Sequence, residues 1–597
     1  MQKVVFSPNI MENAFEIVDK CMGHEDAFCT SRCPMSTDAK GYVKLIGEKK
    51  YVEAIDLIRE KLFLPNTLGR ICAHPCEADC RRNKDFKQPI AIAALKRFAA
   101  EKADHESRWN MTIGQATGKS IAIVGAGPAG AQAAIELRRQ GHAITIFEKL
   151  NSVGGMMRVG IPEYRLPRDI IDYEYSYLTK LGVEFKFGIE IGKDMSFEDL
   201  RTKYDAVVLA HGAHKGNVIP LPGHKADGVF AATEYLKEIS MKRSFDRAGK
   251  RIMVIGGGDV AMDCARSSFR IGAEAVYQCS LEDEANLPAS HAEIEESHEE
   301  GVQFNAGWGP LEIIEENGKV TGIKIQKVAS ILDADGRFNP QYTGEPKIIP
   351  VDTVVMATGQ VVEDITDGAL ETTRGGRYVV DRDTLSTSID NVFVAGDASG
   401  GNIVIEAMAL GRKAAISIDR LFRNEDLKAG RCLKTEWAYQ TQLDVPLPED
   451  SKDLPRIHTR LRNPEERKRD FNQADLGFTD DMAIEEATRC LSCECKLCMR
   501  ECVMMNDFGS CPKDMMEKLV EGQGMDQLLA YSCNACDNCT IVCPHELPMK
   551  KIFIGARKDF VKANNGESPI KGHGAIKMHQ LLGFSKFFTI KRKGGVK

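Results

Sequence analysis

The stretch SIAIVGAGPAGAQAAIELRRQGHAITIFEKLNSVGG, residues Ser120–Gly155, decides the fold. It starts as an apolar β-branched strand, turns at Gly125, Gly127 and Gly130, and continues as a helix. A side chain at these glycines would hold the backbone away from a pyrophosphate, which the helix N-terminus attracts. A second strand ends at Glu148, where a carboxylate accepts hydrogen bonds from a ribose diol. The stretch predicts a dinucleotide-binding unit; the alternative is an ordinary strand-turn-helix.

Composition bounds the class of protein. The 597 residues suit about three or four domains, and the 43% hydrophobic content suits globular cores. A net charge of −7 gives no reason to expect nucleic acid as a partner. The sequence has no apolar run of about 18 residues, and its N-terminus lacks the basic and apolar regions of a signal peptide. We expect a soluble, cytoplasmic protein with no transmembrane segment.

The 19 cysteines gather at the two ends of the chain. One group lies between Cys21 and Cys80 and another between Cys490 and Cys543. Those that stand alone are Cys264, Cys279 and Cys432. A reducing compartment disfavours disulfides, so the two groups predict metal clusters that flank the nucleotide-binding core.

The N-terminal group has the spacing of iron–sulfur ligands. Its members are Cys21, Cys29, Cys33 (followed by Pro34), Cys72, Cys76 and Cys80. Thiolates from tight turns reach one cluster, and a proline ends the turn. Zinc is the alternative, but zinc prefers four ligands in pairs, which two triplets fit poorly.

These cysteines, with GRICAHPCEADC (residues 69–80) and QPIAIAALKRFAAE (88–101), resemble the N-terminal cluster domain of the glutamate synthase small subunit, shared with dihydropyrimidine dehydrogenase. The resemblance implies two [4Fe-4S] clusters. One ligand set falls on Cys21, position 24, Cys29 and Cys80, and the other on Cys33, Cys72, Cys76 and a side chain of the next helix. His24 replaces a cysteine and Lys96 is no iron ligand, so we expect one cluster here and leave the second open. His24 either binds iron or is a surface histidine.

After Glu148, the segment GGMMRVGIPEYRLP (154–167) is similar to the flavin-contacting segment of the same family. The candidate flavin contacts in this half are Gly125, Gly127, Pro128, Ala129, Gly130, Glu148, Lys149, Gly154, Gly155, Met156, Arg158, Ile161 and Arg165. The segment contains no cysteine, which disfavours the dithiol mechanism of disulfide-reducing flavoenzymes.

A second nucleotide unit follows in KRIMVIGGGDVAMDCARSSFRIGAEAVYQCSLED (250–283). Strand Arg251–Ile255 precedes small residues and a helix expected over Asp263–Phe269. The candidate nicotinamide contacts are Gly256, Gly257, Gly258, Asp259, Val260, Ala261, Gln278, Cys279, Ser280 and Gly359. Two such units predict FAD plus a nicotinamide; the alternative is a duplicate that keeps only the fold.

The residues at the end of the strand that follows this helix favour NADH over NADPH. NADPH-using relatives tend to carry an arginine pair there, whereas this chain has Gln278, Cys279, Ser280 and Glu282. Each charge-assisted hydrogen bond contributes ~1.5–3 kcal/mol, so losing two lowers the preference for NADPH by about 100-fold or more. Arg266 and Arg270 on the nearby helix could restore NADPH binding, which leaves the choice open.

The second half of the flavin domain follows the nicotinamide unit, which is therefore inserted. Strands over 206–210 and 354–358 end in small-residue turns suited to passing the chain between domains. A further strand ends at Gly396-Asp397, before a helix expected over Glu406–Leu421. The resemblance implies that Asp397 binds the ribityl chain and that the helix N-terminus faces the flavin pyrimidine. Candidate contacts here are Gly396, Asp397, Asn402, Ile403, Val404 and Ala407.

The C-terminal part begins with a polar stretch, 432–475, expected to be a linker, and a segment, 469–493, that resembles the C-terminal lead-in of glutamate-synthase-like flavoproteins. Cys533, Cys536, Cys539 and Cys543-Pro544 have the bacterial ferredoxin spacing. The upstream cluster has more thiols than it needs: we favour Cys495, Cys498, Cys502 and Cys511, leaving Cys490 and Cys493 for another role. The block resembles the small iron–sulfur subunit of heterodisulfide reductase.

The tail, with Phe584, Phe587 and Phe588 beside KRK (591–593), could dock a partner, touch an anionic membrane or remain solvated.

The sequence thus predicts an α/β fold with two Rossmann-like domains, the nicotinamide domain inserted in the FAD domain, flanked by helical iron–sulfur domains. The expected boundaries are 1–117 (iron–sulfur), 118–218 and 359–430 (FAD), 219–358 (NAD(P)H), 431–480 (linker) and 481–597 (two-cluster ferredoxin-like domain and tail). Three or four clusters in all are expected. We name no general acid or base: His291, Glu293 and His298 are interpreted as an exposed helix face.

The predicted function is NAD(P)H-dependent electron transfer, with NADH favoured. FAD takes a hydride and iron–sulfur clusters carry single electrons to a partner. Ferredoxin, a glutamate synthase large subunit, a hydrogenase or a formate dehydrogenase could each be that partner in a hetero-oligomeric complex. Alternatives are an electron-bifurcating subunit and, from another class, a non-catalytic assembly subunit that keeps its cofactors for structure.

Overall fold

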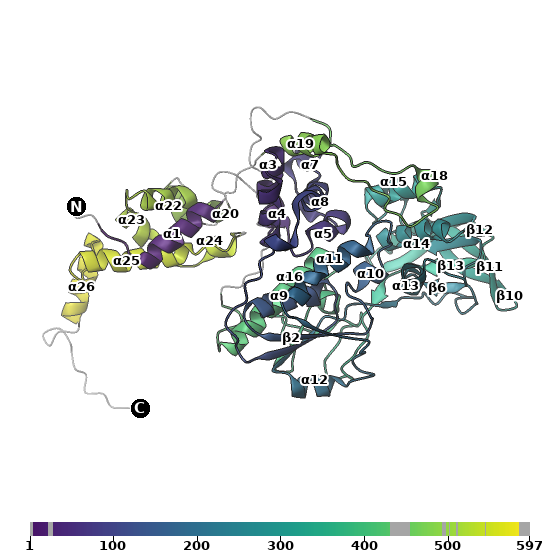
Figure 1. Ribbon diagram of the computed structural model, residues 1–597, viewed down its shortest axis with the longest axis horizontal. Coiled ribbons are helices and arrows are strands. Elements are labelled where there is room, and N and C mark those ends of the chain that lie inside the picture. Colours follow the sequence, from purple (N-terminus) through teal and green to yellow (C-terminus); the bar gives the residue numbers. More distant parts are fainter. Residues whose placement is uncertain are drawn as a thin grey trace.

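The computed structural model describes residues 4–21, 28–429, 454–491, 497–500, 502–508, 511–543 and 545–583. Figure 1 shows a large α/β body and, beside it, a smaller helical body. The predicted fold class is confirmed: two parallel sheets carry the nucleotide units, and helices from both ends of the chain flank them.

The first sheet is formed by the two halves of the flavin domain. Its strand order is β15-β4-β1-β2-β3, all parallel. The strands are β1 (Ser120–Val124), β2 (Ala143–Glu148), β3 (Glu184–Phe187), β4 (Ala206–Leu209) and β15 (Val392–Val394). Helices α9 (Pro128–Arg139) and α16 (Val404–Phe422) pack so closely that a Cβ at Gly411 would lie 2.1 Å from the Ala129 carbonyl oxygen. The absence of a side chain at Gly411 permits this approach. Helices α10 (Met156–Val159), α11 (Arg168–Lys180) and α12 (Phe197–Lys203) complete this half.

The second sheet lies between the two halves of the first in sequence, which confirms the predicted insertion. Its parallel order is β6-β13-β7-β8-β9, with β6 (Val229–Ala231), β7 (Arg251–Ile255), β8 (Ala275–Ser280), β9 (Gln303–Ala306) and β13 (Thr353–Met356). Its helices are α13 (Ala232–Lys242), α14 (Asp259–Arg270) and α15 (His291–Glu300). Helix α14 begins at Asp259, one turn earlier than expected, because the turn glycines lead directly into it.

Two smaller antiparallel sheets complete the β structure. One contains β10 (Trp308–Glu316), β11 (Lys319–Leu332) and β12 (Phe338–Ile349). In the other, β5 (Lys215–Gly216) pairs with β14 (Gln360–Val361). The chain thus enters and leaves the nicotinamide domain through two paired segments.

The N-terminal helices form the side of the large body that lies nearest the smaller body (Figure 1). They are α2 (Phe28–Arg32), α3 (Ala39–Gly47), α4 (Tyr51–Arg59), α5 (Pro65–Ile71), α6 (Pro75–Ala78), α7 (Arg81–Phe86) and α8 (Ile92–Ala103). Helix α19 (Asp480–Thr488), from far along the chain, packs against α3 and α8. A segment of the expected C-terminal domain therefore belongs to the N-terminal one.

The smaller body exchanges an element in the opposite direction. It contains α20 (Leu497–Arg500), α21 (Val503–Asp507), α22 (Pro512–Val520), α23 (Gln527–Ser532), α24 (Asn538–Ile541), α25 (Met549–Ala563) and α26 (Lys571–Gly583), together with α1 (Pro8–Lys20). Ile10, Ala14 and Ile17 of α1 are buried in one core with Met516 and Phe553. Residues 1–117 are therefore not one domain, because the apolar face of α1 packs on the C-terminal helices.

The expected linker is wrong for residues 454–479, which pack on the large body. Arg467, at the end of α18 (Pro464–Arg467), is 1% exposed and bonds Glu300. Residues 430–453 lie outside the described part. None of the described helices combines the length and the apolar character needed to cross a membrane.

Candidate functional site

A cavity of about 1000 Å³ lies where the two parallel sheets meet the N-terminal helices. Its volume suits a cofactor-sized ligand. The predicted contacts that line it are Gly125, Gly127, Pro128, Ala129, Glu148, Gly155, Met156, Ile161, Arg165, Gly258, Asp259, Val260, Gly359, Gly396, Asp397, Asn402, Ile403, Val404 and Ala407. Residues from both nucleotide units therefore share one continuous space.

The flavin side of this cavity fits a nucleotide. No atom lies within 4 Å of the position that a Cβ at Gly127 would take, so this glycine leaves open space. Gly130 has the opposite environment, because a Cβ there would lie 2.1 Å from the Gly125 carbonyl oxygen and separate helix from strand. The Ala126 N–H donates to Glu148 Oε2 over 2.8 Å, which holds the carboxylate at the end of β2. These features form a cradle for a pyrophosphate and a ribose.

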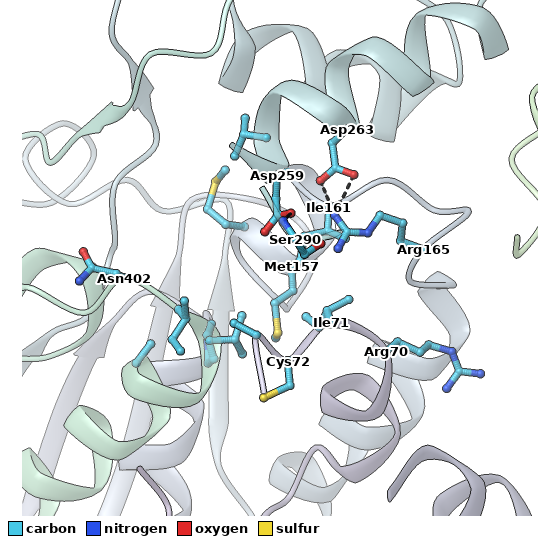
Figure 2. A pocket seen from close by; sticks show the side chains of 18 of the residues that line it. Arg70, Ile71, Cys72, Met157, Ile161, Arg165, Asp259, Asp263, Ser290 and Asn402 are labelled. Carbon is cyan, nitrogen blue, oxygen red and sulfur yellow. Dashed lines mark hydrogen bonds and ion pairs between the residues drawn. The ribbon is translucent and has the colours of Figure 1, made fainter. Parts of the chain in front are cut away.

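The nicotinamide side repeats this arrangement. A Cβ at Gly258 would also meet no atom within 4 Å. Asp259 Oδ1 accepts a hydrogen bond of 2.9 Å from the Ser290 N–H, which joins the start of α14 to the start of α15. In the view of Figure 2, this pair lies beside Ile161 and on the other side of Met157 from Cys72.

Besides the flavin side and the nicotinamide side, the cavity has a wall formed by the N-terminal helices, and a cysteine lies in this wall. Cys72 lines the cavity, together with Ile71 and His74, and is the only cysteine among the described residues that does so. The His74 N–H donates to Cys72 Sγ over 3.3 Å, the kind of bond that stabilises a cluster-ligating thiolate. Burial raises the pKa of the Cys72 thiol, and the nearby Lys96 ammonium opposes that effect.

The structure brings together the second ligand set that the resemblance implies. Cys33, Cys72 and Cys76 lie within electrostatic range of one another, and the same Lys96 lies beside Cys72 and Cys76. Lys96 is 6% exposed, so a buried cation occupies the region of the expected helical ligand. A cation there would offset part of the negative charge of a thiolate-bound cluster.

The first set is divided between the two bodies. Cys21 bonds the Cys511 side chain, and this hydrogen bond is the main reason that the pKa of Cys511 falls to about 7. Cys29 and Cys80 remain in the large body. Cys21 therefore packs against a different core from Cys29 and Cys80, the residues with which the resemblance groups it.

In the smaller body, Cys502 and Cys533 lie near Cys539, whose pKa rises to about 12 through burial and these neighbouring thiols. The Ala535 N–H donates to Cys533 Sγ over 3.4 Å. Cys536 is exposed and Cys498 and Cys543 are half-buried, while Cys493, Cys495 and His24 lie outside the described residues. Within the described ranges, no three Cys, His, Asp or Glu side chains are close enough to bind one metal ion. A [4Fe-4S] cube holds its thiolates farther apart than one ion does.

Arg158 lies outside the cavity lining, whereas Arg165 lines the cavity, and both guanidinium groups are engaged by carboxylates. Arg158 forms an ion pair with Asp172. Arg165 bonds both Asp263 oxygens, over 2.9 and 2.7 Å (Figure 2). It also lies 2.8 Å from Glu293. Because Asp263 and Glu293 are on α14 and α15, Arg165 bridges the two nucleotide domains.

Several predicted nicotinamide contacts are turned into the protein core. Gln278 Nε2 donates to the Gly256 carbonyl, the Cys279 thiol to the Trp308 carbonyl and the Ser280 hydroxyl to the Glu282 carbonyl. None of these three side chains is among the residues that line the cavity. The remaining predicted contacts outside the lining are Gly130, Lys149, Gly154, Gly256, Gly257 and Ala261.

The interpretation of Glu293 as exposed is wrong. Glu293 is 7% exposed and bonds Arg266. Arg266 and Arg270 both bond Glu300, so neither guanidinium is available to hold a 2′-phosphate as the sequence had allowed. His291 and His298 are exposed, as expected.

The sequence reasoning missed two histidines in the cavity, His211 and His214, which follow β4. Burial lowers the pKa of His211 to about 4 and that of His214 to about 3, so both are neutral at pH 7. Among the described residues, His211 Nδ1 is buried with no hydrogen-bond partner. A polar atom left unpaired at the cavity is suited to a bound ligand. The signal was their position, directly after a strand of the parallel sheet.

The fold and the cavity define the class: a flavoprotein oxidoreductase with two dinucleotide sites and iron–sulfur domains at both ends. Comparison with known families agrees. Residues 119–414 match pyridine nucleotide-disulphide oxidoreductases, 3–108 match dihydropyrimidine dehydrogenase domain II (4Fe-4S cluster) and 489–548 match the 4Fe-4S dicluster domain.

Three relatives extend this match. The chain is 35% identical over 501 residues to the NADP(+)-dependent formate dehydrogenase subunit beta of Moorella thermoacetica, covering 78% of this chain and 70% of the relative. It is 33% identical over 524 residues to the NADPH-Fe(3+) oxidoreductase subunit beta of Geobacter sulfurreducens, covering 81% and 76%. It is 33% identical over 438 residues to the glutamate synthase [NADPH] small chain of Escherichia coli, covering 69% and 92%.

The chain belongs to the family of these glutamate synthase small chains and beta subunits. It is an NAD(P)H-dependent oxidoreductase that transfers electrons through a flavin and iron–sulfur clusters.

Proposed function

We propose that this chain oxidises NADH and passes the electrons, in a single series of steps, to a partner redox protein. The observation that supports this is the continuous cavity, which the flavin unit, the nicotinamide unit and Cys72 line together. FAD bound there would accept a hydride and release its two electrons one at a time. The chain's own residues hold the two nucleotides and place a thiolate at the cavity edge.

The neutral histidines and the glycine turns set the electrostatics of binding. His211 and His214 carry no charge at pH 7, so the pyrophosphate is held by backbone N–H groups and helix N-termini. Asp397 lines the cavity after β15, and burial raises its pKa. A hydrogen bond to a ligand hydroxyl there would compensate for that burial.

The presence of one cysteine at the cavity, among the described residues, supports a linear relay of electrons rather than bifurcation. Bifurcation sends the two electrons of one flavin to two different acceptors. Among the described cysteines, Cys72 alone lines the cavity, which supplies one exit. Apart from Cys264 and Cys279 in the nicotinamide domain, the cysteines fall into two groups: Cys29, Cys33, Cys76, Cys80 and Cys490 pack against the same core as Cys72, and Cys21, Cys498, Cys502, Cys533, Cys539 and Cys543 pack in the smaller body. The two groups fit successive positions of one path.

Anaerobic titration with NADH tests the relay. We expect NADH alone, without a second acceptor, to bleach the flavin band and then reduce the iron–sulfur centres, followed by absorbance and electron paramagnetic resonance (EPR). A flavin that is fully loaded but unchanged by NADH would favour the assembly-subunit alternative. Centres that are reduced only when a second acceptor is present would favour bifurcation.

The preference for NADH is argued from the turn after β8. Its side chains include Glu282, Asp283 and Glu284, with no lysine or arginine over 281–290. Carboxylates there repel the 2′-phosphate of NADPH. The relatives named above are NADP(H)-linked by their names, so this turn is where we propose that the chain differs in cofactor choice.

Glu282→Arg is expected to raise the ratio of kcat/KM for NADPH over NADH by about 10- to 100-fold, because the new guanidinium can form one charge-assisted hydrogen bond to the phosphate. Steady-state reduction of a dye acceptor measures both constants. Glu295→Arg, the same charge change on the exposed face of α15, is the control and should leave the ratio unchanged. A wild-type chain that prefers NADPH would refute the NADH proposal.

A further inference from the structure

A second, smaller cavity brings together sulfur atoms from three distant segments of the chain. It lies in the large body, and its lining includes Cys29 after the start of α2, Cys80 before α7 and Cys490 after α19. Apolar side chains such as Phe28, Val43 and Ile92 form the rest of the wall. A group of thiols that face one largely apolar space is suited to an iron–sulfur cluster, which needs thiolates and exclusion of water.

Cys80 has the hydrogen-bond environment of a cluster ligand. The backbone N–H groups of Arg82, Asn83 and Ile90 donate to its sulfur. Three donors aimed at one sulfur stabilise a thiolate, not a thiol.

A network of buried hydrogen bonds fixes the position of the segment that carries Cys490. Glu486 is fully buried and accepts hydrogen bonds from the Ala91 N–H (2.7 Å) and the Ile457 N–H (2.8 Å). Arg489, the residue before Cys490, bonds Glu486 over 2.6 Å and the Gln88 carbonyl over 2.9 Å. The segment that carries Cys490 is therefore fixed to the loop that precedes α8.

The same helical domain supplies positive charge to this cavity. Arg82 lines it and donates to the Arg489 carbonyl over 3.3 Å. Lys40 and Arg81 line it as well, and both are buried. Buried cations around a group of thiols are expected where a bound group is anionic, as a thiolate-ligated cluster is.

We propose that Cys29, Cys80 and Cys490 ligate one [4Fe-4S] cluster, so that a thiolate from the C-terminal part of the chain takes the place that Cys21 leaves. Cys21 contacts Cys511 in the smaller body, whereas Cys490 reaches the cavity of Cys29 and Cys80. The two ends of the chain thus exchange cysteines. This inference rests on the presence of iron–sulfur clusters in the proposed function.

Cys490→Ala, Cys29→Ala and the double variant test the shared site. Iron and acid-labile sulfide per flavin, and EPR spectra of the reduced protein, are the readouts. We expect each single variant to lose one cluster's iron and the same EPR signal, and the double variant to lose no more than either. Cys264→Ala, a buried cysteine of the nicotinamide domain, is the control and should keep every signal.

Three results would overturn the proposal: unchanged iron and spectra in Cys490→Ala, loss of a different signal from that lost in Cys29→Ala, or loss of a further cluster in the double variant. Retained flavin absorbance reports that the large body is folded. If alanine prevents folding, Cys490→Ser keeps an oxygen ligand, and we expect a shifted EPR signal and a lower midpoint potential; an unshifted signal refutes the proposal. A wild-type chain without iron would instead defeat the proposed function as a whole.

Discussion

Gly127→Val is expected to give a folded protein that lacks its flavin. Gly127 has φ −74° and ψ −179°, which valine adopts without strain, and its Cβ position has no neighbour within 4 Å. The apo chain can therefore accommodate the side chain. The added atoms would enter the cavity where the pyrophosphate approaches the N-terminus of α9, and we expect FAD affinity to fall by at least about 100-fold.

Gly258→Val is the matched variant in the nicotinamide unit. Gly258 has the same extended backbone, φ −92° and ψ 176°, and the same open space. We expect this variant to keep its flavin absorbance while the KM for NADH rises at least about 10-fold. Flavin content after purification, FAD titration of the apoprotein and NADH kinetics measure the two effects separately.

Gly130→Val distinguishes a binding defect from a folding defect. Its Cβ would lie 2.1 Å from the Gly125 carbonyl oxygen, so the unfolding temperature of the apoprotein should fall. For Gly127→Val, the unfolding temperature of the apoprotein should match that of wild type. Wild-type flavin content in Gly127→Val would contradict the assignment of this cradle.

Glu300→Ala is expected to destabilise the nicotinamide domain more than any surface change. Glu300 is fully buried and accepts hydrogen bonds from Arg270 (2.7 Å), Arg266 (2.8 Å) and Arg467 (2.9 Å). Removing one partner of a buried ion pair leaves uncompensated charge and costs about 3–5 kcal/mol. Because Arg467 belongs to segment 454–479, the variant should also release that segment.

The expected loss corresponds to a fall of roughly 10 °C in the unfolding temperature of this domain, which calorimetry with NADH absent can measure. Glu295→Ala is the control, because Glu295 is exposed on the same helix; its effect should stay within about 0.5 kcal/mol. Faster proteolysis within 454–479 would report release of the segment. Equal unfolding temperatures for the two variants would show that the buried cluster does not stabilise the domain.

The same cluster predicts an acid dependence. Burial alone would raise the pKa of Glu300, but hydrogen bonds and charge from Arg270 and Arg266 outweigh it and lower the pKa from 4.5 to about 2. The folded state therefore binds this proton more weakly than the unfolded state. The stabilisation is present above pH about 4.5 and is lost as pH falls toward about 2. Glu300→Gln removes the charge, so its stability deficit relative to wild type should narrow over that range.

Local pattern was sufficient for the nucleotide units. Strand, turn glycines and helix are contiguous in sequence, and the acid that ends β2 follows at a fixed distance, so Gly127, Glu148 and Gly258 could be placed in advance. Their order along the chain also predicted the inserted domain. The N-terminal thiols Cys33, Cys72 and Cys76, which the family motif groups by their spacing, lie near one another in the structure.

Long-range pairing could not be predicted in the same way. The histidines after β4 reach the cavity only because β4 lies next to β1 in the sheet. Arg165 was predicted to be a flavin contact, and its ion pairs with Asp263 and Glu293 were not predicted. These partners are about 100 residues away or more in sequence. Glu293 was predicted to be exposed because its helix is polar. In the structure Arg266 and Arg165 form ion pairs with Glu293 in the protein interior.

By itself, the sequence determined that the chain has two dinucleotide units and thiol groups at both ends, because those properties reside in short contiguous motifs. Only the tertiary structure decided which thiols meet. The apolar face of α1 packs with the C-terminal helices, and the buried Glu486 and Arg489 hold Cys490 against the N-terminal ones. Burial of apolar faces and pairing of buried charges act between segments hundreds of residues apart, and spacing along the chain carries no record of either.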